Sequence, residues 1–153
     1  MSTARTAEDT YTRSLQNEFA STSTVDRIGF PELVEVVEET FCSPSGDNRI
    51  REVIRRTVLP RIKDDTDVLV LACTHFLHIR NILDEEIPKH VRIVDSLDGV
   101  VRRIEHLSGL DGRTVGPAAK KEIPVRFYFS GGTTLPRQYS CLTDRYDVRG
   151  VPW

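Results

Sequence analysis

The sequence lacks several features that mark large classes of protein. Its longest uninterrupted apolar run, from Val68 to Cys73, is far shorter than the ~20 residues of a membrane-spanning helix. Lysine and arginine number 21 against 23 acidic residues, so the net charge of −2 leaves no basic excess to attract nucleic acid or anionic lipid. The first twenty residues contain no apolar block of the kind that a signal peptide needs, and we therefore expect a cytoplasmic protein with a small-molecule partner.

Cysteine is also scarce. Cys42, Cys73 and Cys141 are widely spaced, odd in number and without a Cys-x-x-Cys pair. This pattern suits neither a disulfide framework nor a cysteine-rich zinc site. The sequence predicts three reduced thiols.

What is present is the composition of a soluble globular protein of 153 residues, 39% of them hydrophobic. Helical and strand periods alternate along the first hundred or so residues, which is typical of parallel strands joined by helices. We therefore predict an α/β fold, a parallel sheet flanked by helices. The alternation of helical and strand periods ends at Leu110. The predicted organisation is therefore an α/β domain at 1–110 followed by a connector and tail at 111–153.

The expected elements follow from periodicity, turn formers and helix caps. Strand 67–73 is continuously apolar, which favours a strand covered on both faces. Helix 97–107 presents a stripe of apolar residues that we expect to be buried. The remaining expected elements are helices 7–20, 31–41, 50–59 and 74–86, the last capped by Thr74, strands 24–28 and 91–95, a cap at Ser96, and a lone strand at 125–129.

Chemistry is most plausible at the end of strand 67–73, where Cys73, Thr74 and His75 follow one another. Ligands of open parallel sheets bind at the carboxyl ends of the strands. A thiol at a helix N-terminus is stabilised as thiolate, and His75 is close enough in sequence to hold or relay its proton. Residue types alone leave open a buried structural cysteine beside a surface histidine.

Other candidate sites carry weaker signals. Cys73, His75 and His78 do not have a standard zinc spacing and lack a clear fourth ligand, so we expect no metal. Glu38 lies among several acidic residues of one helix, where a solvated face is the simpler interpretation. Three further features fit surface or local structural roles: the surface histidines His90 and His106, the Asp95–Ser96 pair as a helix cap, and Ser130-Gly131-Gly132 as a turn.

Three segments together resemble a known family. Residues 67–75 read DVLVLACTH and are followed by Phe76, and residues 91–96 read VRIVDS. This combination is similar to the second half of glutamate racemases, in the aspartate/glutamate racemase family. Upstream, residues 29–38 (GFPELVEVVE) resemble a family segment that ends in glutamate, and this resemblance makes Glu38 a candidate active-site residue.

The resemblance implies cofactor-independent interconversion of L- and D-glutamate for peptidoglycan synthesis. Inversion at Cα needs one group to remove a proton and another to deliver one on the opposite face, and the family uses two cysteines for this. Cys73 matches the second of them. By the same resemblance His75 is its acid/base partner, Thr74 binds substrate and Glu38 sets the proton inventory, with no cofactor and no metal.

The front half of the family pattern is missing. Neither an Asp-Ser-Gly-x-Gly-Gly loop nor a Cys-Asn-Thr segment with the first catalytic cysteine occurs here. The chain therefore resembles the C-terminal half of a two-domain racemase, with the opening strand of that half lying before Thr3 and a tail that returns to the first domain. We expect the isolated chain not to racemise glutamate. The partners considered are a missing N-terminal half or a homo-oligomer; the alternative functions are a non-catalytic binding module, a truncated gene product or a related racemase acting on aspartate.

Overall fold

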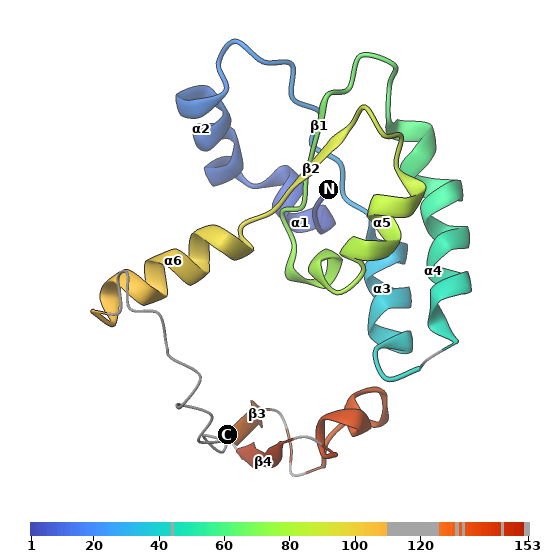
Figure 1. Cartoon of the computed structure of the whole chain (residues 1–153), viewed down its shortest axis with the longest axis vertical. Helices are drawn as coiled ribbons and strands as arrows, with labels where there is room; N and C mark the ends of the chain where they lie inside the picture. Colours follow the sequence, from blue (N-terminus) through green and yellow to red (C-terminus); the bar gives the residue numbers. More distant parts are fainter. Residues whose placement is uncertain (44, 110–125, 131, 133, 145, 152–153) are drawn as a thin grey trace, which may run out of the picture. The chain divides into compact units, whose positions relative to one another are not determined.

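The computed structural model describes residues 1–43, 45–109, 126–130, 132, 134–144 and 146–151 (Figure 1). The chain forms two compact units: residues 1–40 with 44–97, and residues 41–43 with 98–153. The expected connector after Leu110 lies outside the described residues, and the division into 1–110 and 111–153 stays a prediction. Within the described part, no helix is both long and apolar enough to cross a membrane.

The first unit is built on two parallel strands, β1 (Val68–Val70) and β2 (Arg92–Val94), paired with Leu69 opposite Ile93. The ladder continues one residue further, because the Leu71 N–H donates to the Val94 carbonyl at 2.8 Å. Both strands lie within the predicted strand segments, 67–73 and 91–95, but are shorter. The α/β class with a parallel sheet is confirmed.

The first two residues extend this sheet. The Met1 amine donates to the Val70 carbonyl at 2.8 Å, and the Ala72 N–H donates to the Met1 carbonyl at the same distance. Burial lowers the pKa of that amine. On the other side Ser2 forms a parallel bridge with Gly29. The prediction of a strand at 24–28 was therefore wrong, because the pairing here is a single bridge at Gly29.

Helices α3 (Pro31–Thr40), α4 (Gly46–Val53) and α5 (Arg80–Glu86) lie together on one side of β1 and β2 (Figure 1). Pro31 begins α3 as its sequence predicts, since proline suits the first helical turn. After α4 the chain continues through a π-helical turn at Ile54–Val58 and a 3₁₀ turn, η2, at Leu59–Arg61 that contains Pro60.

These elements share one hydrophobic core. Its fully buried side chains come from α3, the π-helical turn, η3 and α5. The core residues are Phe30, Leu33, Val36, Val37, Ile50, Val53, Ile54, Val58, Leu71, Phe76, Ile79, Ile82, Leu83, Ile87, Val91 and Ile93. On the opposite face of β1 the described residues leave Val70 52% exposed, so the expectation of a strand buried on both faces was wrong.

Two expected helices are broken. The predicted helix 7–20 is divided into α1 (Ala4–Glu8) and α2 (Thr10–Phe19), because Asp9 has an extended backbone. The predicted helix 74–86 is divided into a 3₁₀ turn, η3 (Thr74–Leu77), and α5. Thr74 is the first residue of η3 and not its cap; Cys73 occupies the cap position without a side-chain hydrogen bond to the turn.

The second unit contains a small parallel sheet that the sequence did not predict in full. Strand β3 (Arg126–Ser130) pairs with β4 (Asp147–Val151), and η5 (Arg137–Leu142) lies between them in the chain. The Phe127 and Tyr146 rings lie 4.9 Å apart between centroids. The strand expected at 125–129 thus exists but is not alone. The Ser130-Gly131-Gly132 turn falls partly outside the described residues.

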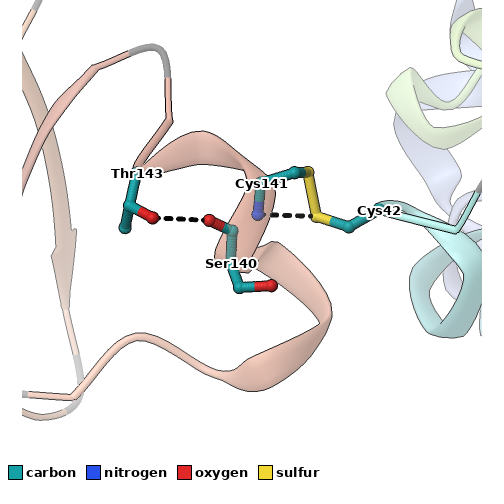
Figure 2. The surroundings of a disulfide bond; sticks show 4 residues. All are labelled: Cys42, Ser140, Cys141 and Thr143. Atoms are coloured by element: carbon teal, nitrogen blue, oxygen red, sulfur yellow. Dashed lines mark hydrogen bonds between the residues drawn. A yellow bond between two sulfur atoms is a disulfide. The ribbon is translucent and has the colours of Figure 1, made fainter.

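A disulfide bond joins Cys42 to Cys141, which is in η5 (Figure 2). Their Cα atoms are 5.5 Å apart, within the range that a disulfide spans. The expectation of three reduced thiols was therefore wrong for this pair, because η5 brings together two cysteines separated by 99 positions. Cys73 is free.

Helix α6 (Leu97–Leu107) forms where expected but does not bury its apolar stripe. The exposed fractions are 51% for Val100, 44% for Val101, 56% for Ile104 and 69% for Leu107. Periodicity correctly indicated an amphipathic helix. The prediction that the stripe is buried was wrong, because the described residues leave this face open to solvent.

Gly29 gives a direct test of the packing around the Ser2 bridge. A Cβ at this position would lie 2.6 Å from the Ala4 Cα, a backbone atom that cannot rotate away. We expect Gly29→Ala to lower the free energy of unfolding by about 1–3 kcal/mol, the usual cost of overpacking. The matched control is Gly99→Ala in α6, where the new Cβ meets nothing within 4 Å. Urea denaturation of both variants measures the difference, and equal midpoints would contradict this account.

Candidate active site

The candidate site lies where β1 and β2 end. A pocket of about 400 Å³ opens there, and its lining is apolar on the strand side and polar where the chain leaves the strands. Cys73 and Thr74 reach it from the end of β1, and Asp95 and Ser96 from the end of β2. The complete lining is Val70, Leu71, Ala72, Cys73, Thr74, Leu77, Val94, Asp95 and Ser96.

Starting from Cys73 in the pocket lining, three side chains form a continuous hydrogen-bonded chain. The Cys73 Sγ lies 3.3 Å from the His75 Nδ1, and the His75 Nε2 is hydrogen-bonded to the Glu38 Oε1. Cys73 follows β1, His75 is in η3 and Glu38 is on α3, whose buried Leu33 and Val37 fix that helix against the core. The structure therefore brings together all three residues that the sequence singled out as catalytic.

The order of these contacts determines which imidazole nitrogen can take a proton. An ionised carboxylate only accepts hydrogen bonds, so contact with Glu38 requires a proton on the His75 Nε2. In the neutral ring Nδ1 is then the acceptor, and it faces the Cys73 thiol. When Nδ1 takes the thiol proton, Glu38 stabilises the imidazolium that results. This is the arrangement of a thiol activated by an oriented base.

The side chains of His75 and Glu38 are 29% and 32% exposed, so the relay is partly shielded from water while Cys73 faces the pocket. Partial shielding strengthens the hydrogen bonds without removing solvent, which can exchange protons with the far end of the relay. The geometry suits a group that gives up and regains a proton repeatedly.

Asp95 has a different role. Its Oδ1 accepts the Leu97 N–H at 2.9 Å, and its Oδ2 is paired with Arg80. The Leu97 N–H first, and then the Arg80 guanidinium, hold the pKa of the Asp95 carboxyl below its usual range against the opposing effect of burial. Asp95 is therefore an ionised group with its charge already balanced, which fits anchoring the start of α6 better than proton transfer.

Arg80 is the residue of this region that the sequence did not reveal. Its guanidinium also approaches the Ile93 carbonyl at 3.4 Å, so it links the start of α5 to the end of β2. The pairing joins positions 15 apart through the tertiary fold, and no local sequence signal announces it. Among the described residues, no group of three or more His, Cys, Asp or Glu side chains is arranged to hold a metal ion.

The relay predicts how Glu38 affects Cys73. Glu38→Gln keeps an acceptor for His75 but removes the charge, and charge-assisted hydrogen bonds are about twice as strong as neutral ones. We expect iodoacetamide to alkylate Cys73 about tenfold more slowly, which corresponds to about 1.4 kcal/mol. Glu35→Gln, on the exposed side of the same helix, is the control and should leave the rate unchanged. Peptide mass spectrometry of Cys73 gives the rates; equal slowing by both variants would exclude the relay.

The fold is that of a parallel α/β protein with a hydrogen-bonded thiol beyond a strand end. Comparison with known proteins identifies the family within this fold class. No protein-family model matches the chain. Glutamate racemase from Treponema pallidum (strain Nichols) is 34% identical over 119 residues, covering 78% of this chain and 44% of the relative. Glutamate racemase from Halothermothrix orenii is 32% identical over 131 residues, covering 86% and 50%.

Solved structures agree on the fold. Escherichia coli glutamate racemase, in a complex with L-glutamate and the activator UDP-MurNAc-Ala, superposes with a TM-score of 0.70 at 24% identity, over 97% of this chain and 55% of that one. A Bacillus anthracis glutamate racemase isoform gives a TM-score of 0.64 at 19% identity, over 92% and 52%. The chain belongs to the glutamate racemase family. It spans about half the length of the curated relatives it matches.

Proposed function

We propose that this chain supplies one half of a cofactor-independent, two-base glutamate racemase site, with Cys73 as its acid/base. The observation that carries the proposal is the Cys73–His75–Glu38 relay, which begins at a pocket at the carboxyl ends of β1 and β2. The relatives' names support glutamate as the substrate. On this proposal the product, D-glutamate, serves peptidoglycan synthesis in the cytoplasm.

In this half-site Cys73 removes the Cα proton of one enantiomer, and His75 accepts the proton that the thiol had carried. The Thr74 and Ser96 hydroxyls border the same pocket and are suited to donate to the substrate's carboxylates. A second acid/base on the opposite face of Cα must come from outside the described site, either from an N-terminal half or from another copy of the chain. Without it the carbanion regains its proton from Cys73 and the configuration is retained.

The experiment tests whether the chain exchanges the Cα proton from one face only. The purified protein is incubated in D₂O with each glutamate enantiomer, and Cα deuteration and configuration are measured separately. We expect deuteration of one enantiomer with retention and no racemisation. Deuteration of both enantiomers with inversion would show a complete site and contradict the half-site.

The alternative function is a non-catalytic binding module or a truncated gene product, and the observation favouring it is the coverage of about half of each relative. This alternative predicts no deuteration of either glutamate enantiomer. An aspartate racemase half-site would deuterate aspartate in place of glutamate in the same assay.

A further inference from the structure

We propose that the Cys42–Cys141 disulfide is a redox-controlled tether that governs the reactivity of the Cys73 relay. Cys42 lies two residues beyond the end of α3 and four residues after Glu38 in the chain. Cys141 lies in η5, so the bond closes within the second unit, at the segment 41–43 that directly continues α3 in the chain. Figure 2 shows the bond and the η5 turn around it.

The contacts at the bond suit reversible opening. Both cysteines are half-buried, so a reductant can reach the sulfur atoms. Accessible disulfides are the labile ones, whereas enclosed ones resist exchange. Phe41 packs edge-on against Tyr139 with ring centroids 5.5 Å apart, and this contact keeps the two segments close enough for the bond to form again.

The redox step needs a dithiol reductant. One of its thiolates attacks one sulfur of the Cys42–Cys141 pair, the bond between the two cysteines breaks, and a mixed disulfide forms. The second thiol of the reductant then displaces the remaining cysteine and closes its own disulfide. Two electrons and two protons pass to the protein, which leaves Cys42 and Cys141 as thiols.

Reduction of the disulfide affects the Cys73–His75–Glu38 relay through α3. Glu38 is in the last turn of α3, four residues before Cys42, and it orients His75 toward Cys73. Closing the tether restrains the chain just beyond this turn. Opening it removes this restraint, so Glu38 spends less time on His75 and Cys73 reacts more slowly.

Two measurements test the tether on the full chain. In air-oxidised protein, unfolded without reductant, one cysteine should react with iodoacetamide; after dithiothreitol treatment all three should react. Next, the alkylation rate of Cys73 is compared between oxidised protein and protein reduced and then desalted without oxygen. We expect about a threefold slower rate in the reduced form, the size of a modest coupling. Three reactive thiols in the oxidised sample, or equal Cys73 rates, would overturn the proposal.

The double variant Cys42→Ser/Cys141→Ser is the control, because it cannot form the tether. Its Cys73 rate should match that of the reduced protein and should not respond to dithiothreitol. A rate equal to that of the oxidised protein would contradict the coupling. The proposal builds on the relay of the proposed racemase half-site, but its readout is thiol alkylation, so a failure to exchange glutamate protons leaves this test intact.

Discussion

Cys73→Ala should reduce deuteration of the glutamate Cα by about 10²–10⁴-fold, the usual contribution of a positioned acid or base. The thiol is the group of the relay that lines the pocket, and alanine leaves no acid or base in its place. Cys73 is only partly buried, so the loss of its sulfur costs little packing. The measurement is the rate of deuterium incorporation in D₂O, followed by proton NMR.

Cys73→Ser provides the matched comparison, because it keeps the shape of the side chain and replaces the thiol with a far less acidic hydroxyl. It should lose the exchange almost as completely as the alanine variant. Circular dichroism should show both variants folded like the parent. Exchange that persists in either variant would remove Cys73 from the proposed mechanism.

Phe76→Ala should cause the largest loss of stability in the first unit. Phe76 lies in η3, its side chain is fully buried, and it is among the largest buried residues of the core. Truncation of a buried phenylalanine costs about 3–5 kcal/mol, a large part of the 5–15 kcal/mol that stabilises a typical domain. We expect the urea midpoint to fall steeply, with part of the protein unfolded in plain buffer.

Phe19→Ala is the control for this prediction. Phe19 is 76% exposed, and substitutions at such positions usually change stability by less than about 0.5 kcal/mol. The two variants remove the same atoms, so the difference between their urea midpoints isolates the effect of burial. Similar midpoints for both would mean that Phe76 is not part of a close-packed core.

Elements of the first unit were predicted well where the residues of one segment alone determine the element. Pro31 marks the start of α3, and the apolar run after Asp67 marks β1. Cys73 and His75 were found from their place at the end of a predicted strand, and Glu38 through family resemblance. The structure adds the order of the contacts from Cys73 through His75 to Glu38. That order depends on the packing of α3, which no spacing in the sequence encodes.

Features that depend on distant partners were missed. Cys42 and Cys141 are 99 positions apart, and the scarcity of cysteine pointed away from their bond. Strand β4 lacks a continuous apolar run, with Arg149 and Gly150 in its interior, so only its pairing with β3 identifies it. The apolar stripe of α6 was predicted to be buried and is exposed. Periodicity indicates that a helix is amphipathic but not what covers its apolar face.

The exposed stripe of α6 also affects how the folded state is assayed. Dyes such as anilinonaphthalene sulfonate fluoresce on accessible apolar surface, and their binding is commonly taken as a sign of a molten globule. Val100, Ile104 and Leu107 offer such a surface on a well-formed helix. The native chain should therefore bind the dye, and loss of near-ultraviolet circular dichroism, not dye fluorescence, is the signal that reports its unfolding.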